Sequence, residues 1–201
     1  QALQKYIDNN CVSGDGRAWT NWRPFYSVVS QANLLIDQLN KMDDGLFKQR
    51  SKQQLIAQAL FLRAFTYFYM VRVWGDVPAM YAPIYAPRAV PDIPRTSQQD
   101  ILDSCINDLE TAVKGLSWTV AQQSKDRDVK VTKGAVYSCL AHIYAWRHEW
   151  LKAEDACNQV INSGQYELVN TTRYLDLYKP NTAQKETIFV IQFQRLDSCC
   201  S

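Results

Sequence analysis

Long apolar runs are missing from this sequence. No stretch approaches the roughly 18 consecutive apolar residues that a membrane-spanning helix needs, although 47% of the 201 residues are hydrophobic. Residues 1–5 also lack the basic-then-apolar layout of a secretion signal, which leaves the location of the protein open. The composition predicts a globular chain that is long enough to bury one real core.

Motifs for metal binding and catalysis are missing as well. The two histidines, His142 and His148, are six residues apart and do not share a helical face, and there is no CxxC pair. No GxSxG, phosphate-binding or dinucleotide-binding glycine motif occurs, and nothing nominates the two facing carboxylates of a glycosidase. We therefore expect no enzymatic activity, no cofactor and no metal site.

An excess of either sign of charge is missing too. The chain has 22 Lys and Arg against 20 Asp and Glu, a net charge of +2, and these charges are dispersed along the sequence. Because no long basic run is present, we do not expect nucleic acid or an anionic membrane surface to be a partner.

Amphipathic helix patterns are what the sequence does contain. Apolar residues recur at three-to-four spacing in five segments that we expect to be helical: residues 25–39, 51–74, 101–116, 132–144 and 150–162. The second segment is aromatic or apolar nearly all round from Phe61 to Trp74, which predicts a helix buried on most faces. Thr96-Ser97 followed by Gln99-Asp100 is a capping-box pattern for the third.

Two segments do not fit a helix. Residues 76–95 contain five of the seven prolines, which forbids helix, but they are too apolar for a free linker and are expected to pack on the surface. Residues 188–193 read IFVIQF, and this β-branched and aromatic run predicts a short C-terminal strand.

The fourth and fifth helices match the spacing of a tetratricopeptide repeat. Small residues fall where two helices must approach closely and large ones where they interlock; the matching positions are Leu140, Ala141, Tyr144, Ala153, Cys157 and Val160. Such a hairpin needs neighbouring hairpins to cover its apolar face. We expect a mainly all-α, tetratricopeptide-like α-α superhelix.

Six cysteines show no disulfide framework. Cys105, Cys139 and Cys157 fall on apolar helix stripes and are expected in the core, where a thiol behaves as a small hydrophobe. Cys199 and Cys200, near the end of the sequence, receive no structural role.

Residues 60–78, LFLRAFTYFYMVRVWGDVP, resemble the FLRA…YF…R…GDVP block of SusD/RagB proteins. Weaker similarities extend this resemblance from about residue 22 to residue 193. It implies a single SusD-like helical domain over residues 1–201 with four parts: a helix pair at 18–75, the proline-rich loop at 76–95, tetratricopeptide-like helices at 96–164 and an extended segment at 165–201.

What the resemblance implies is a non-catalytic lipoprotein on the cell surface of an outer membrane. Members of the family capture glycans or oligopeptides and form a lid on a SusC-type TonB-dependent transporter. They are much longer and begin with an acylated cysteine, whereas Cys11 lacks the small apolar residues of a lipidation site. We therefore expect a fragment whose lipid anchor lies outside it, and much of whose ligand surface does too. The alternative is a tetratricopeptide-like scaffold whose concave face binds a partner protein, without a transport role.

Trp19 and Asn21 are the candidate ligand-binding residues. They lie in a loop before the first helix, where an exposed ring can stack on a sugar and a nearby amide can hydrogen-bond to it. The alternative is that Trp19 simply tucks against the helices, and we assign Trp22 to packing. Arg63 and Arg72 lie in the aromatic helix, where buried cations need partners such as Asp76 or Asp108.

Overall fold

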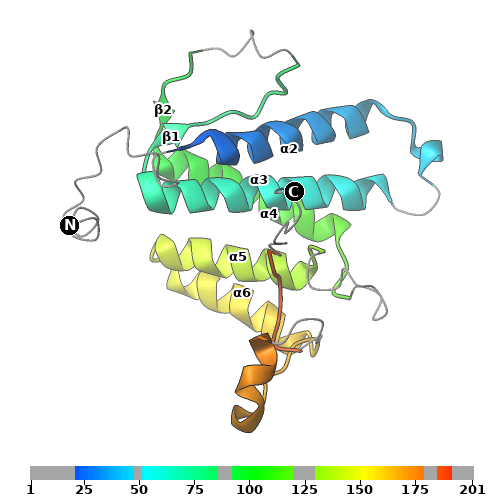
Figure 1. The fold of residues 1–201 in the computed structure, drawn as a ribbon, viewed down its shortest axis with the longest axis vertical. Coiled ribbons are helices and arrows are strands. Elements are labelled where there is room, and N and C mark those ends of the chain that lie inside the picture. Colours follow the sequence, from blue (N-terminus) through cyan, green and yellow to red (C-terminus); the bar gives the residue numbers. More distant parts are fainter. Residues whose placement is uncertain (1–20, 48–50, 86–91, 120–129, 179–184, 192–201) are drawn as a thin grey trace, which may run out of the picture.

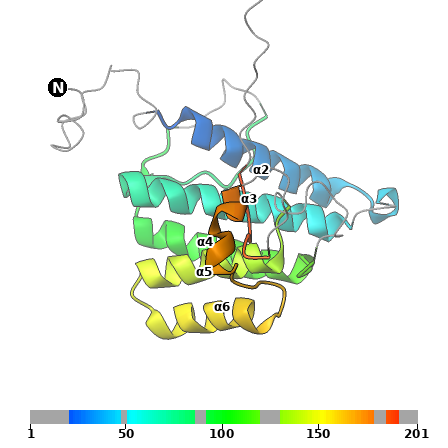
Figure 2. The same ribbon diagram turned by 60° about the horizontal axis from the view of Figure 1, so that its bottom comes forward.

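The computed structural model describes residues 21–47, 51–85, 92–119, 130–178 and 185–191. In this part of the chain, five α-helices follow one another in sequence order from one end of the molecule to the other (Figures 1 and 2): α2 (Arg23–Lys41), α3 (Lys52–Trp74), α4 (Gln98–Gly115), α5 (Lys133–Trp146) and α6 (Trp150–Asn162). Two 3-10 helices, Asp44–Leu46 and Thr171–Tyr178, are shorter. The prediction of a mainly helical, tetratricopeptide-like chain is confirmed.

Local chemistry explains where these helices begin and end. Ser51, Ser97 and Thr132 each accept, on the side-chain oxygen, a hydrogen bond from the backbone N–H three residues later, which pairs one otherwise unsatisfied donor. Ser97 also donates to the carboxylate of Asp100 at 2.7 Å, so the predicted cap of α4 is confirmed. α3 ends at Gly75, whose φ of +70° suits glycine.

α3 forms the centre of the core. It contacts α2 on one side and α4 on the other, as the aromatic pattern of its second half predicted. Because neighbours cover it on several sides, ten of its residues are buried: Ala57, Ala59, Leu60, Phe61, Ala64, Thr66, Tyr67, Phe68, Met70 and Val71. Leu62 and Val73 lie in the stretch that is apolar nearly all round, but they remain 41% and 40% exposed.

α5 and α6 form the predicted helix hairpin, with one correction in α6. Ala156 and Val160 are buried, but Cys157 is exposed and does not belong to the core. One residue along a helix is a rotation of about 100°, so the next position after Ala156 turns away from α5. Cys105 and Cys139 are buried, as predicted.

The first part of the proline-rich loop, residues 76–85, packs on the helices, as predicted, and residues 86–91 lie outside the described residues. Tyr26 donates from its hydroxyl to the carbonyl of Pro78 at 2.7 Å, and Asn33 donates to that of Met80 at 2.8 Å. The hydroxyl of Tyr67 accepts from the N–H of Met80 and donates to its carbonyl. These bonds satisfy backbone groups that a loop without secondary structure would leave unpaired.

Two short strands close the base of this loop. β1 (Val77–Pro78) pairs antiparallel with β2 (Arg95–Thr96), with Val77 opposite Thr96. The strand predicted at 188–193 is not found in the part that the structure describes. Residues 188–191 form no strand, and residues 192–193 lie outside the described residues. A strand needs a partner for its backbone, and among the described residues the two strands pair with each other. Ile188 and Phe189 instead pack their side chains on the core.

Candidate functional site

The predicted ligand-binding loop is described only from Asn21 onward. Trp19 lies outside the described residues, as do Cys11, Cys199 and Cys200. Asn21 is exposed, and its side-chain oxygen accepts the N–H of Arg23 at 3.0 Å at the start of α2. The assignment of Trp19 and Asn21 to a ligand site therefore stays a prediction.

An aromatic cluster lies directly beside Asn21. Trp22 contacts Trp74 at a ring-centroid distance of 6.0 Å, and Phe25 contacts the same ring at 5.1 Å. The guanidinium of Arg95 lies 5.1 Å from the Trp22 ring and donates to a backbone carbonyl at Asp76. Trp22 is partly buried and packs against the core, so its assignment to packing is confirmed.

Arg63 joins three helices rather than lining a site. Its guanidinium donates two hydrogen bonds of 2.7 Å to the two carboxylate oxygens of Asp108 on α4, and one of 2.8 Å to Asn33 on α2. The side chains of Arg63 and Asp108 are 11% and 13% exposed. Burial by itself lowers the pKa of Arg63, but the hydrogen bonds and charge of Asp108 outweigh it and raise the pKa above its ordinary value. The predicted pairing of Arg63 with an acidic group from another helix is confirmed.

Arg72 behaves differently and corrects the prediction that it is a buried cation. It is exposed, and its guanidinium lies 4.4 Å from the ring of Phe68 and 5.6 Å from that of Tyr69. A cation on an aromatic face can keep its hydration on the other side, so no buried carboxylate is required. Asp76 instead accepts the N–H of Gln98 at 2.8 Å, at the first turn of α4.

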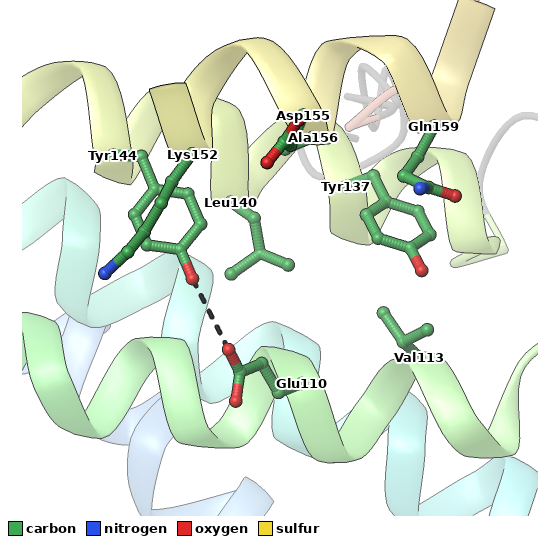
Figure 3. A pocket seen from close by; sticks show the side chains of 9 residues that line it. All are labelled: Glu110, Val113, Tyr137, Leu140, Tyr144, Lys152, Asp155, Ala156 and Gln159. Carbon is green, nitrogen blue, oxygen red and sulfur yellow. Dashed lines mark hydrogen bonds between the residues drawn. The ribbon is translucent and has the colours of Figure 1, made fainter. Parts of the chain in front are cut away.

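A groove of about 320 Å³ lies between α4, α5 and α6 (Figure 3). Its lining combines aromatic, apolar, acidic and amide side chains: Glu110, Val113, Tyr137, Leu140, Tyr144, Lys152, Asp155, Ala156 and Gln159. The Tyr144 hydroxyl donates to Glu110 at 3.4 Å, and the Lys152 ammonium lies 5.4 Å from the Tyr144 ring. Burial, with a smaller contribution from the charge of Glu110, raises the pKa of Tyr144.

Sequence reasoning missed this groove. Its side chains come from three helices, and which helices lie together is a tertiary fact. A partial signal was present: Tyr137 and Tyr144 are seven residues apart on one face of α5, and Lys152, Asp155 and Gln159 recur at three-to-four spacing on α6. Such spacing predicts a shared face but not what lies opposite.

A second cavity, of about 440 Å³, lies between α3 and α5 and is bordered by the segment 188–191. Phe189 contacts the ring of Phe61 at 5.2 Å, edge to face, and that of Phe65 at 6.2 Å. The chain thus covers part of this face with its own side chains. His142 lines the same cavity and is exposed.

Metal and membrane features can be assessed for the described residues. Among them, no group of three or more His, Cys, Asp and Glu side chains is arranged to hold a metal ion. No helix in this part of the chain is both long and apolar enough to cross a membrane.

Comparisons with known proteins agree on one family. A family model described as SusD-like, "starch-binding associating with outer membrane", matches residues 1–145. A SusD-like protein of Bacteroides ovatus is 32% identical over 188 residues, which cover 86% of this chain and 32% of that protein. The chain therefore spans about a third of the length of the curated relatives that it matches.

Solved structures give the same result. A SusD-superfamily protein of Bacteroides thetaiotaomicron is similar at a TM-score of 0.79 with 28% identity, covering 92% of this chain and 45% of that one. A structure determined with a xylogluco-oligosaccharide is similar at a TM-score of 0.64 with 31% identity, covering 79% of this chain and 32% of that one. By its family match over residues 1–145, by its identity to these relatives and by its fold, this chain belongs to the SusD-like family.

Proposed function

We propose that this chain is a helical domain of a longer, non-catalytic surface protein of the outer membrane that binds glycans and delivers them to a SusC-type TonB-dependent transporter. The observation that carries the proposal is the likeness to the structure with a xylogluco-oligosaccharide, at 31% identity. The family description, starch-binding in association with the outer membrane, supports it. Attachment through a lipid anchor, and oligopeptides as a second class of ligand, belong to the same proposal.

The exposure of Asn21 is compatible with a binding role for the loop before α2. Asn21, the described residue of this loop, is exposed and directly precedes Trp22, whose ring contacts that of Trp74 beside Phe25. Trp19 would supply the ring on which a sugar stacks, and Asn21 the amide that fixes its orientation.

The scaffold alternative finds less support. In a stack of helix hairpins, the first helix of each hairpin contributes to one shared face. Here these helices are α3 and α5, and a scaffold would bind its partner protein on that face. Phe189 already packs on Phe61 and Phe65 there. A partner peptide would have to displace these contacts.

The test is native affinity electrophoresis in gels containing starch or xyloglucan, with the chain and with the longest natural polypeptide that contains it. We expect retardation by at least one polysaccharide. Trp19→Ala should weaken binding about tenfold, as the loss of one stacking ring does, and should lower the free energy of unfolding by less than about 1 kcal/mol, as exposed sites do.

The matched control is Trp150→Ala, because Trp150 is 62% exposed on α6 and is also a large exposed ring. Its removal should leave retardation unchanged. Binding that survives Trp19→Ala and Asn21→Ala together would remove these residues from the site, and no retardation by any glycan in either polypeptide would contradict the proposed function.

A further inference from the structure

The groove between α4, α5 and α6 carries an excess of negative charge. Glu110 on α4 and Asp155 on α6 both line it, and neither has an ion-pair partner among the described residues. The one cation in the lining, Lys152, is paired with Glu149 at 2.6 Å. Figure 3 shows Glu110 and Asp155 on opposite walls, with Leu140 between them. Two uncompensated carboxylates favour a positively charged occupant.

Aromatic rings complete a surface that suits such an occupant. Tyr137 and Tyr144 stand on the α5 side of the groove, and Trp118 stacks on Tyr137 at 5.6 Å with an interplanar angle of 17°, which holds that ring in place. The chain already shows that a cation fits this chemistry, because the ammonium of Lys152 lies 5.4 Å from the Tyr144 ring.

From this geometry we propose that the groove binds a lysine or arginine side chain from an extended segment of a partner protein. The aliphatic stem lies over Leu140 and beside Tyr137, and the charged head donates hydrogen bonds to the carboxylates of Glu110 and Asp155. Gln159, at the Tyr137 end of the groove, offers an amide to the backbone of the bound segment.

A neutral sugar fits the same groove less well. One face of Tyr137 is covered by Trp118, and Lys152 lies over Tyr144, so little open ring area remains for a pyranose. A sugar hydroxyl would offer the two carboxylates neutral donors only, whereas a cationic head adds the attraction of opposite charges to its hydrogen bonds. No residue of α2 lines the groove, so this site and the glycan-binding loop can be tested separately.

The test uses the chain in low-salt buffer and two blocked pentapeptides, acetyl-Gly-Ser-Arg-Ser-Gly-amide and the same peptide with citrulline in place of arginine. Citrulline keeps the shape and loses the charge. We expect the arginine peptide to shift the amide NMR signals of α4, α5 and α6 with a dissociation constant on the order of 1 mM, as a few charge-assisted hydrogen bonds allow. The citrulline peptide should bind about tenfold more weakly.

Substitutions locate the site. Asp155→Asn and Glu110→Gln should each weaken binding of the arginine peptide about fivefold, since each removes one charged acceptor. The matched control is Glu154→Gln: Glu154 is exposed on the same helix, does not line the groove and has no ion pair among the described residues. Glu154→Gln should change the dissociation constant of the arginine peptide by less than about twofold, because its only effect is a small change in net charge.

Three outcomes would overturn the proposal: equal binding of the citrulline peptide, equal weakening by Glu154→Gln, or no shift of groove amides by the arginine peptide. Titration with maltohexaose distinguishes the competing ligand class. If this neutral glycan shifts the groove amides and the arginine peptide does not, the groove is a sugar site. If the groove does not bind the arginine peptide, the expected effect of Trp19→Ala on electrophoretic retardation by glycans is unchanged. The two proposals can therefore fail independently.

Discussion

α3 and α6 are both helices with many apolar residues, yet they differ in how many helices they contact and in how many residues they bury. α3 has α2 and α4 on two sides and buries ten residues. α6 packs chiefly on α5, buries Ala156 and Val160, and leaves Leu151 and Ile161 79% and 68% exposed. The difference teaches that apolar content decides how much a helix can bury, while the number of its neighbours decides how much it does bury.

This contrast predicts an uneven distribution of stability. Local opening is easiest where few apolar contacts hold an element, so α6 should exchange its amide hydrogens faster than α3. The hydrogen-bonded group of Arg63, Asp108 and Asn33 strengthens the contrast, because it ties α3 to α2 and α4 but does not reach α6.

The largest effect is expected at Arg63. Arg63→Ala should lower the free energy of unfolding by about 3–5 kcal/mol, since it leaves the largely buried carboxylate of Asp108 without its partner. Arg72→Ala, an exposed arginine on the same helix, should cost less than about 1 kcal/mol and serves as the control. Urea denaturation of both variants measures the difference. Equal midpoints would mean that the ion pair does not hold the centre of the molecule together.

The same substitution, leucine to alanine, can be made in the core around α3 and on α6, and the two losses of stability can be compared. Leu109 on α4, which packs on α3, is fully buried, and Leu109→Ala should cost roughly 2–5 kcal/mol by leaving a cavity. Leu151 on α6 is 79% exposed, and Leu151→Ala should stay within about 0.5 kcal/mol of the parent. Thermal unfolding of the pair is the measurement. A comparable loss at Leu151 would show that α6 is covered in solution.

The reactivity of the cysteine thiols compares the core with α6 without a measurement of stability. In a variant with serine at positions 11, 199 and 200, iodoacetamide at pH 8 should label Cys157 and spare Cys105 and Cys139, because the thiolate is the reactive form and only the first thiol is accessible. Burial raises the pKa of Cys139 to about 12 and also raises that of Cys105. Mass spectrometry of tryptic peptides reads the labelling. Rapid labelling of Cys139 would indicate that the core opens as readily as α6.

The same two buried thiols make stability depend on alkaline pH. In the unfolded chain each thiol ionises with its ordinary pKa of 9.0, whereas burial in the folded chain keeps it protonated. The unfolded state therefore binds fewer protons above that pH, and the free energy of unfolding should fall as the pH rises from about 9. Below pH 8 this contribution should not change. Urea denaturation at a series of pH values measures the slope.

Much of the fold was readable from local patterns. The helices at 51–74 and 150–162 begin and end close to the predicted residues. In the first of them, Ser51 and Gly75 set the ends through the backbone of their own turn. The packing of the proline-rich loop followed from its apolar content, and the pairing of Arg63 followed from the cost of burying an unpaired charge. The misplacement of Cys157 arose because a repeat spacing defines a face only to within one residue.

Sites depend on a different kind of information. Asn21 and Trp19 were selected because sugar stacking has a recognisable residue chemistry, and their role stays a prediction. The groove of Glu110, Tyr137 and Asp155 was not foreseen, since its walls come from helices whose separation in space no spacing rule reports. The strand at 188–193 was predicted from side-chain type, but a strand also needs a neighbouring backbone to pair with, which residues 188–191 do not have among the described residues.

The sequence by itself determined the helices, the cap of α4 and the need for a partner at Arg63, because each of these depends on interactions within a few residues or on the cost of burying one group. The tertiary structure alone decided that Asp108 and Asn33 are the partners, that α6 keeps its outer apolar residues exposed, and that α4 and α6 enclose an acidic groove. Those outcomes depend on which distant segments meet, and contacts between distant segments are set by the packing of whole helix faces.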